Sequence, residues 1–177
     1  MKSQTKQIRI REERADDIHQ VSSVNDAAFG QPTEGHIVDR LRGADVEAVS
    51  LVAILDEKVV GHIFFSSVTV ETEQGEINGM GLATMAVVPG HQREGVGSEL
   101  VAEGLKNIRE KGYPFVVVLG HEANCPRFGF KPASEYGLKC QWEGIPDEVF
   151  MAIIFKMDRM KEVSVTVYYR KEFTKAV

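Results

Sequence analysis

The spacing of apolar residues divides the chain into predicted strands and predicted helices. Residues 7–11 alternate between apolar and polar side chains, which is typical of a short strand with one buried face. Runs rich in β-branched residues predict three further strands, at 51–55, 59–70 and 77–88. Short polar connections separate these three runs, so we expect them to form an antiparallel meander.

Three other segments repeat their apolar residues at helical spacing. The first predicted helix opens at Asp16 or Asp17, and the second covers residues 34–42. The third begins at Gly95 and ends at the pair Lys111 and Gly112, a cation and a glycine of the kinds that close helices. Its apolar residues form one stripe, at Val96, Leu100, Val101, Leu105 and Ile108.

A crossover connection is predicted in the middle of the chain. Residues 115–119 form a short apolar run after the third helix, which predicts a buried strand. Because a strand, a helix and a second strand make a βαβ unit, we expect 77–88 and 115–119 to be parallel neighbours. Residues 163–169 alternate again and predict a last strand. The pattern as a whole predicts an α/β (α+β) fold with a mixed, mostly antiparallel sheet and flanking helices.

Length and composition indicate one compact domain. The chain has 177 residues, of which 43% are hydrophobic, enough for a full core. We expect a single domain over residues 1–177, with 157–177 as a C-terminal strand extension. The longest apolar runs, 48–55 and 149–155, are far shorter than the roughly 18 residues of a membrane-spanning helix, and the polar N-terminus lacks a signal-peptide core. We therefore expect a cytoplasmic protein without a membrane partner.

Charge and cysteine content narrow the classes of partner. The formal net charge of -5 argues against non-specific nucleic-acid binding, which needs a basic face to neutralise phosphates. The two cysteines, Cys125 and Cys140, give no disulfide framework, and no group of Cys and His has the spacing of metal ligands. We therefore expect neither a nucleic-acid partner nor a metal ion.

Residues 92–98, Gln-Arg-Glu-Gly-Val-Gly-Ser, join a predicted strand to the long helix. About four amides in the first turn of a helix lack an intrachain partner, and the helix dipole adds about half a positive charge there. Gly95 and Gly97 have no Cβ atoms, so a phosphate can approach the main chain closely. The segment therefore predicts a local anion-binding site.

Two common phosphate loops do not fit this segment. No lysine follows the glycines as in Gly-x-x-x-x-Gly-Lys-Ser/Thr, and Leu100 stands where a dinucleotide-binding loop has its third glycine. The pattern present from Gln92 to Gly97 is Gln/Arg-x-x-Gly-x-Gly. It resembles the acetyl-CoA pyrophosphate loop of the Gcn5-related N-acetyltransferase (GNAT) superfamily.

Further matches extend the resemblance over nearly the whole chain. Residues 116–130 look like the fifth strand and following helix of the family, and they end in its characteristic Arg-Phe-Gly-Phe. The YhbS-like subgroup of these acetyltransferases is similar at five more short motifs: Ala-Phe-Gly (28–30), Glu34, Leu-Arg (41–42), Val-Gly-His-Ile (60–63) and Pro-Asp-Glu-Val-Phe-Met-Ala (146–152).

The resemblance implies acetyl-CoA as cosubstrate and a site for it. In GNAT folds the two parallel strands splay apart and pantetheine slots into the gap, where the main chain of Met85, Ala86 and Val87 would bind it. The pyrophosphate would sit on the amides of seven consecutive residues: Gln92, Arg93, Glu94, Gly95, Val96, Gly97 and Ser98. By analogy, Asn124 and Arg127 would lie near the far side of the cofactor.

The resemblance also implies acetylation of an amine, which needs few protein groups because the thioester is already activated. The protein must hold the amine against the carbonyl carbon, accept a proton from it and reprotonate the leaving thiolate. Many GNAT members use a tyrosine for the last task, and this chain has Cys125 at that position. A thiol with a pKa of about 8.5 can donate a proton. Alternatively, Cys125 only fills the space, and water takes the role or the role is lost.

Two further residues are candidates for catalysis, each with a plain structural alternative. Glu34 matches an acidic position of the subgroup and would receive the amine proton; otherwise it is an exposed helix glutamate. His121 follows the strand 115–119, where a side chain with a pKa of about 6.5 suits base chemistry. Otherwise it caps the next helix. The neighbouring Glu122 is open to the same two interpretations, since the helix dipole stabilises a carboxylate there.

Three functions remain open on the sequence alone. The first is an N-acetyltransferase that transfers the acetyl group of acetyl-CoA to a primary amine of a small molecule or protein, by direct attack in a ternary complex. The second is a non-catalytic acyl-CoA-binding sensor, motivated by Cys125, and the third is an interaction module that uses the fold without a cofactor. No motif identifies the amine acceptor, and the pattern is compatible with a monomer or with a homodimer paired through a terminal strand.

Overall fold

The computed structural model describes residues 7–120, 124–160 and 164–174. The strands are β1 (Arg9–Glu12), β2 (Ala48–Leu55), β3 (Lys58–Thr72), β4 (Gly75–Val87), β5 (Phe115–Leu119), β6 (Lys131–Pro132), β7 (Leu138–Cys140), β8 (Phe150–Ile154) and β9 (Val165–Tyr168). The helices are α1 (Ile18–Phe29), α2 (Thr33–Gly43), α3 (Val96–Glu110) and α4 (Lys171–Thr174). Five single 3-10 turns lie at Ala15–Asp17, Pro89–His91, Cys125–Phe128, Ala133–Tyr136 and Met157–Met160.

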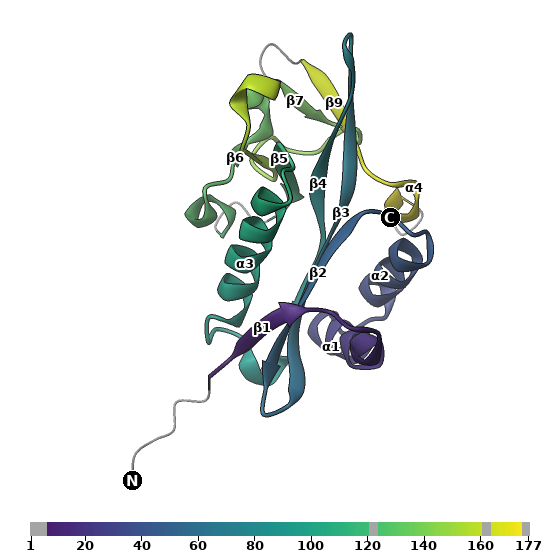
Figure 1. Cartoon of the computed structure of the whole chain (residues 1–177), viewed down its shortest axis with the longest axis vertical. Helices are drawn as coiled ribbons and strands as arrows, with labels where there is room; N and C mark the ends of the chain where they lie inside the picture. The colour runs from purple at the N-terminus through teal and green to yellow at the C-terminus, as the bar shows by residue number, and fades with distance from the viewer. Residues whose placement is uncertain (1–6, 121–123, 161–163, 175–177) are drawn as a thin grey trace.

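The strands form one twisted sheet between two layers of helices. Figure 1 shows α3 on one side of the sheet and α1, α2 and α4 on the other. The strand order is β1-β2-β3-β4-β5-β8-β6, and β9 pairs with both β3 and β7. The β4–β5 and β7–β9 pairs are parallel, whereas the other pairs are antiparallel. The predicted meander, the crossover and the mixed, mostly antiparallel sheet are therefore confirmed.

The parallel strands β4 and β5 stay together over a short stretch. Their pairs in the described chain are Met80 with Val116 and Gly81 with Val117. Beyond Gly81, β4 continues along β3 to Val87, while β5 continues along β8 to Leu119. The two strands therefore splay apart, as the family resemblance implied.

A bulge in β4 lies where the two strands diverge. Phe64 of β3 pairs with Thr84, but the next residue, Phe65, pairs with Leu82, so Ala83 is an extra residue on β4. A bulge bends the strand that carries it and increases its twist. In this chain the bulge begins directly after the last residue of β4 that pairs with β5.

Apolar side chains fill both faces of the sheet. On one face α3 contributes to a cluster with β2, β3, β5 and β8; its members on α3 and β5 are Val96, Leu100, Val101, Ile108, Val116 and Val118. The alternate residues of β5, Phe115 and Val117, belong to a second cluster on the opposite face, with Val68 and Tyr169. Alternation along β5 thus assigns each cluster to a face.

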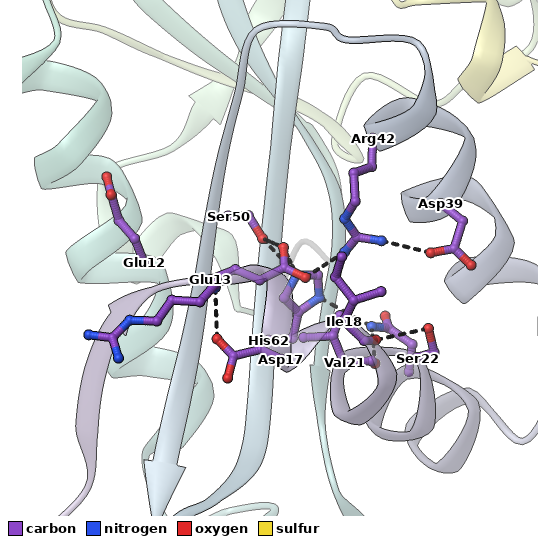
Figure 2. A network of polar contacts seen from close by, with 12 residues as sticks. Glu12, Glu13, Asp17, Ile18, Val21, Ser22, Asp39, Arg42, Ser50 and His62 are labelled. Atoms are coloured by element: carbon purple, nitrogen blue, oxygen red, sulfur yellow. Dashed lines mark hydrogen bonds and ion pairs between the residues drawn. The ribbon is translucent and has the colours of Figure 1, made fainter.

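A buried polar network joins α1 and α2 to the sheet on the face opposite α3 (Figure 2). The amide nitrogen of Asn25 donates to Nδ1 of His62 (3.1 Å), so Nε2 carries the proton and donates to Ser50 Oγ (3.0 Å). Ser50 in turn donates to Glu13, which is paired with Arg42. Burial, and secondarily the Arg42 charge, lowers the pKa of His62 to about 3, so the ring is neutral near pH 7.

The structure differs from the predicted elements at four points, one of which is the short helix α4 after β9, where a strand extension was expected. The helix expected after β5 is, over Cys125–Phe128, a single 3-10 turn, which ends where Gly129 adopts a φ of +95°. Strands β6 and β7 were not predicted, because two or three residues are too few to show a period. Strand β8 was not predicted either, although it lies within the apolar run 149–155. Its neighbours in the sheet, β5 and β6, are not adjacent to it in the sequence.

None of the helices in the described ranges is long and apolar enough to cross a membrane.

Candidate functional site

A cavity of about 500 Å³ opens where β4 and β5 part, beside the N-terminus of α3. Its wall is formed by the splayed strands, by the turn before α3 and by the 3-10 turn after β5. The lining residues are Phe65, Leu82, Met85, Val87, His91, Gln92, Arg93, Gly95, Gly97, Ser98, Val101, Val118, Asn124, Cys125, Arg127, Phe128 and Phe130. The volume is typical of a ligand pocket.

The N-terminus of α3 makes one end of the pocket rich in hydrogen-bond donors. Gly95 precedes the helix with a φ of +88°, in the left-handed region that favours glycine. The first helical hydrogen bond runs from the amide of Glu99 to the carbonyl of Gly95. The amides of Val96, Gly97 and Ser98 therefore have no carbonyl partner within the helix, and the N-cap provides no side-chain hydrogen bond. Such an end attracts anions.

Gly97 brings the backbone of α3 to the pocket wall. A Cβ atom at Gly97 would lie 3.6 Å from Sδ and Cε of Met85 and 3.8 Å from a methyl carbon of Val87, which are ordinary contact distances. Met85 and Val87 themselves line the pocket. A side chain at position 97 would thus fit the protein, but it would use space through which a ligand can approach the helix amides.

Two arginines add positive charge to the same end of the pocket, Arg93 and Arg127. Arg127 Nη2 donates to Ser98 Oγ at 2.7 Å, and the guanidinium carbon lies 4.9 Å from the ring centroid of Phe128. These contacts link the turn after β5 to the first turn of α3. The planar guanidinium group is well suited to bind phosphate oxygens.

Local hydrogen bonds shape the turn before α3. Gln92 Nε2 donates to the carbonyl oxygen of Val87 at 3.0 Å, which connects the turn to the end of β4. His91 Nδ1 lies 3.0 Å from a carboxylate oxygen of Glu94. Arg93, between them, has a φ of +64°. The turn is therefore held by bonds to its own residues and to the strand that leads into it.

The other end of the pocket is an apolar slot between the splayed strands. Leu82 on β4 and Val118 on β5 line it, together with Phe65 and Phe130. Among the described strands, β4 has no partner along this edge beyond Gly81. An extended ligand in the slot can therefore reach main-chain groups of β4 between residues 82 and 87.

Cys125 lines the pocket next to the strand end. Its Sγ atom lies only 2.7 Å from the position that a Cβ atom on Gly120 would take, so the sulfur is packed against the backbone there. Burial raises the pKa of the Cys125 thiol above its usual value. The group is consequently a neutral thiol at neutral pH, able to donate a proton but not a ready nucleophile.

The structure brings most of the predicted cofactor residues into one wall. The members that line the pocket are Met85, Val87, Gln92, Arg93, Gly95, Gly97, Ser98, Asn124 and Arg127. The side chain of Ala86 instead packs on the opposite face with α1, that of Val96 is buried in the core under α3, and Glu94 pairs with His91. For Ala86 and Val96 only the main chain is available to a ligand in the pocket.

The predicted catalytic residues are more scattered. Cys125 lines the pocket. Glu34, in the first turn of α2, is outside the pocket lining and accepts hydrogen bonds from the side chain of Gln31. His121 and Glu122 lie outside the described residues. The catalytic roles of Cys125, Glu34 and His121 all stay predictions.

Sequence reasoning missed the apolar part of the wall. The additional lining residues are Phe65, Leu82, Val101, Val118, Phe128 and Phe130. A core position and a pocket position both read as apolar in a sequence, so no local signal separates them. His91, beside the anion turn, also lines the pocket.

Comparison with known proteins agrees with this geometry. A family model described as an acetyltransferase (GNAT) domain matches residues 9–133. The chain is 34% identical over 149 residues to the uncharacterized N-acetyltransferase YhbS of Escherichia coli strain K12, covering 84% of this chain and 87% of that protein.

Two solved structures are similar over almost the whole chain. The crystal structure of Escherichia coli YhbS in complex with CoA has a TM-score of 0.89 and 30% identity, and the match covers 98% of this chain and 96% of that one. A GNAT family acetyltransferase from Brucella melitensis in complex with acetyl-CoA has a TM-score of 0.78 and 33% identity, covering 94% and 98%. This chain therefore belongs to the GNAT acetyltransferase family.

Proposed function

We propose that the protein is an N-acetyltransferase that transfers the acetyl group of acetyl-CoA to a primary amine of a small molecule or a protein. The observation that carries the proposal is the junction of the α3 amides with the apolar slot between β4 and β5. At this junction a site for phosphate groups meets an apolar slot that suits the uncharged pantetheine arm of a cofactor. Relatives support the choice of ligand, because the Escherichia coli structure contains CoA and the Brucella structure contains acetyl-CoA.

The residues of the pocket fit acetyl-CoA in charge and shape. The amides of residues 96–98 and the guanidinium groups of Arg93 and Arg127 would hold the pyrophosphate. The main chain of residues 85–87 would bind the pantetheine arm along the free edge of β4. Gly97 leaves the space that these contacts need.

The reaction transfers one acyl group and needs no redox partner. Bound acetyl-CoA supplies an activated thioester. The amine nitrogen, once deprotonated, forms a bond to the carbonyl carbon, and the C–S bond breaks with its electron pair leaving on sulfur. One proton leaves the amine and one returns to the thiolate, so the products are an amide and CoA thiol. The protein positions the two reactants and handles these protons.

Cys125 is our candidate donor for the second proton. It lines the pocket, and burial keeps its thiol protonated. The same residue also favours a second candidate function, an acyl-CoA sensor without turnover, because it stands where many GNAT members have the tyrosine that donates this proton. We further propose a single domain over residues 1–177, supported by the one sheet that contains all nine described strands.

The test is a titration of acetyl-CoA into the purified protein, followed by free-thiol release across a panel of primary amines. Binding together with thiol release for at least one amine would establish the transferase. Binding without release from any amine supports the sensor, and lack of binding would overturn both. In the active case, Cys125→Ala should lower turnover with little change in acetyl-CoA affinity.

A further inference from the structure

On the sheet face opposite α3, three buried hydroxyl groups have no hydrogen-bond partner among the described residues. They are Ser66 Oγ, Thr84 Oγ1 and the Tyr169 hydroxyl. Their residues are 0%, 4% and 6% exposed. A buried hydroxyl without a partner costs about 1–3 kcal/mol, and native proteins rarely keep one without a reason. Three such groups at neighbouring positions are hydrogen-bonding groups that the protein itself leaves unused.

The three hydroxyls come from neighbouring positions of β3, β4 and the end of β9. Ser66 pairs with Gly81 across β3 and β4, and Phe64, two residues earlier on the same face, pairs with Thr84. Ser66 and Thr84 are therefore diagonal neighbours across the β4 bulge.

The Tyr169 ring covers the same spot. Its Cε1 atom would lie 2.8 Å from a Cβ atom on Gly81, whereas Cδ1 would be 3.4 Å away. Because Cε1 is bonded to the carbon that bears the hydroxyl, the hydroxyl end of the ring is the end closer to Gly81. An alanine at position 81 would collide with this ring.

This spot is the closed end of the gap between β4 and β5. Gly81 and Val117 form the last parallel pair, and the next residues, Leu82 and Val118, line the pocket on the α3 face. Tyr169 belongs to the cluster of Val117 on the other face. The Tyr169 hydroxyl therefore lies near the apex of the gap, across the sheet from the pocket.

Tyr169 is held in one orientation. The centroids of the Trp142 and Phe173 rings both lie 5.1 Å from that of Tyr169. The backbone amide of Tyr169 donates to Gln141 Oε1 at 2.6 Å. Burial, with a smaller contribution from Cys140, raises the pKa of Tyr169, so the phenol keeps its proton. A fixed, protonated hydroxyl is a preorganised donor.

We propose that the Tyr169 hydroxyl donates a hydrogen bond to the carbonyl oxygen of the acetyl thioester as negative charge develops there during amine attack. The inference rests on the proposed function and takes the acetyl group to lie at the apex of the gap, where the last β4–β5 pair closes the slot. Tyr169 acts as a stabiliser of this charge and keeps its proton throughout. Removing one donor of this kind typically lowers kcat by about 10²- to 10³-fold.

The experiment compares Tyr169→Phe with Tyr168→Phe, a control at the adjacent residue, which is 47% exposed. Each variant and the wild type are titrated with CoA and with S-carboxymethyl-CoA, whose carboxylate puts an anionic oxygen near the position of the acetyl oxygen. For Tyr169→Phe we expect unchanged CoA affinity and about tenfold weaker binding of S-carboxymethyl-CoA, the loss of one hydrogen bond to a charged group. Tyr168→Phe should bind both like the wild type.

Thermal unfolding separates this role from a structural one. The hydroxyl has no partner in the protein itself, so Tyr169→Phe should leave the Tm unchanged or raise it. A variant that binds both ligands like the wild type, or that loses both equally, overturns the inference. The ligand titrations need no acceptor amine. A wild type that binds CoA but shows no turnover would contradict the transferase, and the titrations would still test Tyr169. A wild type that binds no CoA would overturn both proposals. With an active acceptor, kcat should fall about 100-fold at unchanged KM for acetyl-CoA.

Discussion

Gly97→Ala separates a contribution to ligand binding from a contribution to stability. The methyl group would meet Met85 and Val87 at 3.6 Å and 3.8 Å, so the folded protein accepts it without a clash. Position 97 lies in the first turn of α3, where replacing glycine by alanine stabilises a helix by up to about 1 kcal/mol. The Tm should therefore stay constant or rise slightly.

The same methyl group occupies the pocket wall between the helix amides and a bound phosphate. Losing one amide hydrogen bond to a charged oxygen costs about 1.5–3 kcal/mol. Since 1.4 kcal/mol is a factor of ten, the Kd for acetyl-CoA should rise about 10- to 100-fold. A Tm that is unchanged or raised together with weaker acetyl-CoA binding would therefore assign Gly97 to ligand binding and not to stability.

Calorimetric titration and thermal unfolding of the same preparations provide the two readouts. Gly90→Ala is the matched control, because Gly90 lies in the same connection, outside the pocket lining, with nothing within 4 Å of its Cβ position. Equal acetyl-CoA affinity of Gly97→Ala and the wild type would refute the assignment of the α3 N-terminus as the phosphate site. A large fall in Tm would show instead that the turn itself was disrupted.

Three further predictions follow from the contacts described. Gly104→Ala would place a methyl group 2.6 Å from the ring of Phe65, which lines the pocket. Urea unfolding should show a free energy of unfolding lower by about 1–3 kcal/mol, and titration should show weaker binding of acetyl-CoA. Unchanged values for both would contradict this packing. Folding holds the pKa of His62 near 3 instead of 6.5, so between these pH values the unfolded state binds one more proton, and the free energy of unfolding should fall as the pH drops. His62→Gln should reduce the slope of the free energy of unfolding against pH by up to about 1.4 kcal/mol per pH unit. Identical slopes for the variant and the wild type would argue against a buried neutral ring. Arg127→Met should weaken acetyl-CoA binding about tenfold and make it less sensitive to salt, while an unchanged salt dependence would show that the guanidinium serves only its bond to Ser98.

Local sequence patterns predicted the parts of the site that depend on consecutive residues. The strand before residue 88, the glycines at 95 and 97 and the stripe of α3 lie within one continuous segment, and hydrogen bonding between near neighbours decides their structure. An anion site at this helix N-terminus could therefore be inferred before any tertiary contact was known. The parallel pairing of β4 with β5 was predictable for a similar reason, because the crossover helix leaves few alternatives.

Tertiary packing decided the features that depend on residues far apart in the sequence. The bulge at Ala83 arises from the register between β3 and β4, and no local pattern marks it. Phe65 and Val118 read as ordinary core residues in the sequence, and the splay of the strands places them in the pocket wall.

The polar residues show the same division. His62 is buried against Asn25 and Ser50, which come from α1 and β2. Tyr169 reaches the apex of the gap only because β9 returns to pair with β3. The sequence by itself determined the local elements and the phosphate-binding turn, since these follow from backbone hydrogen bonding and the period of apolar residues. The tertiary structure alone decided which distant side chains meet at the slot, because that depends on strand register and on packing between elements.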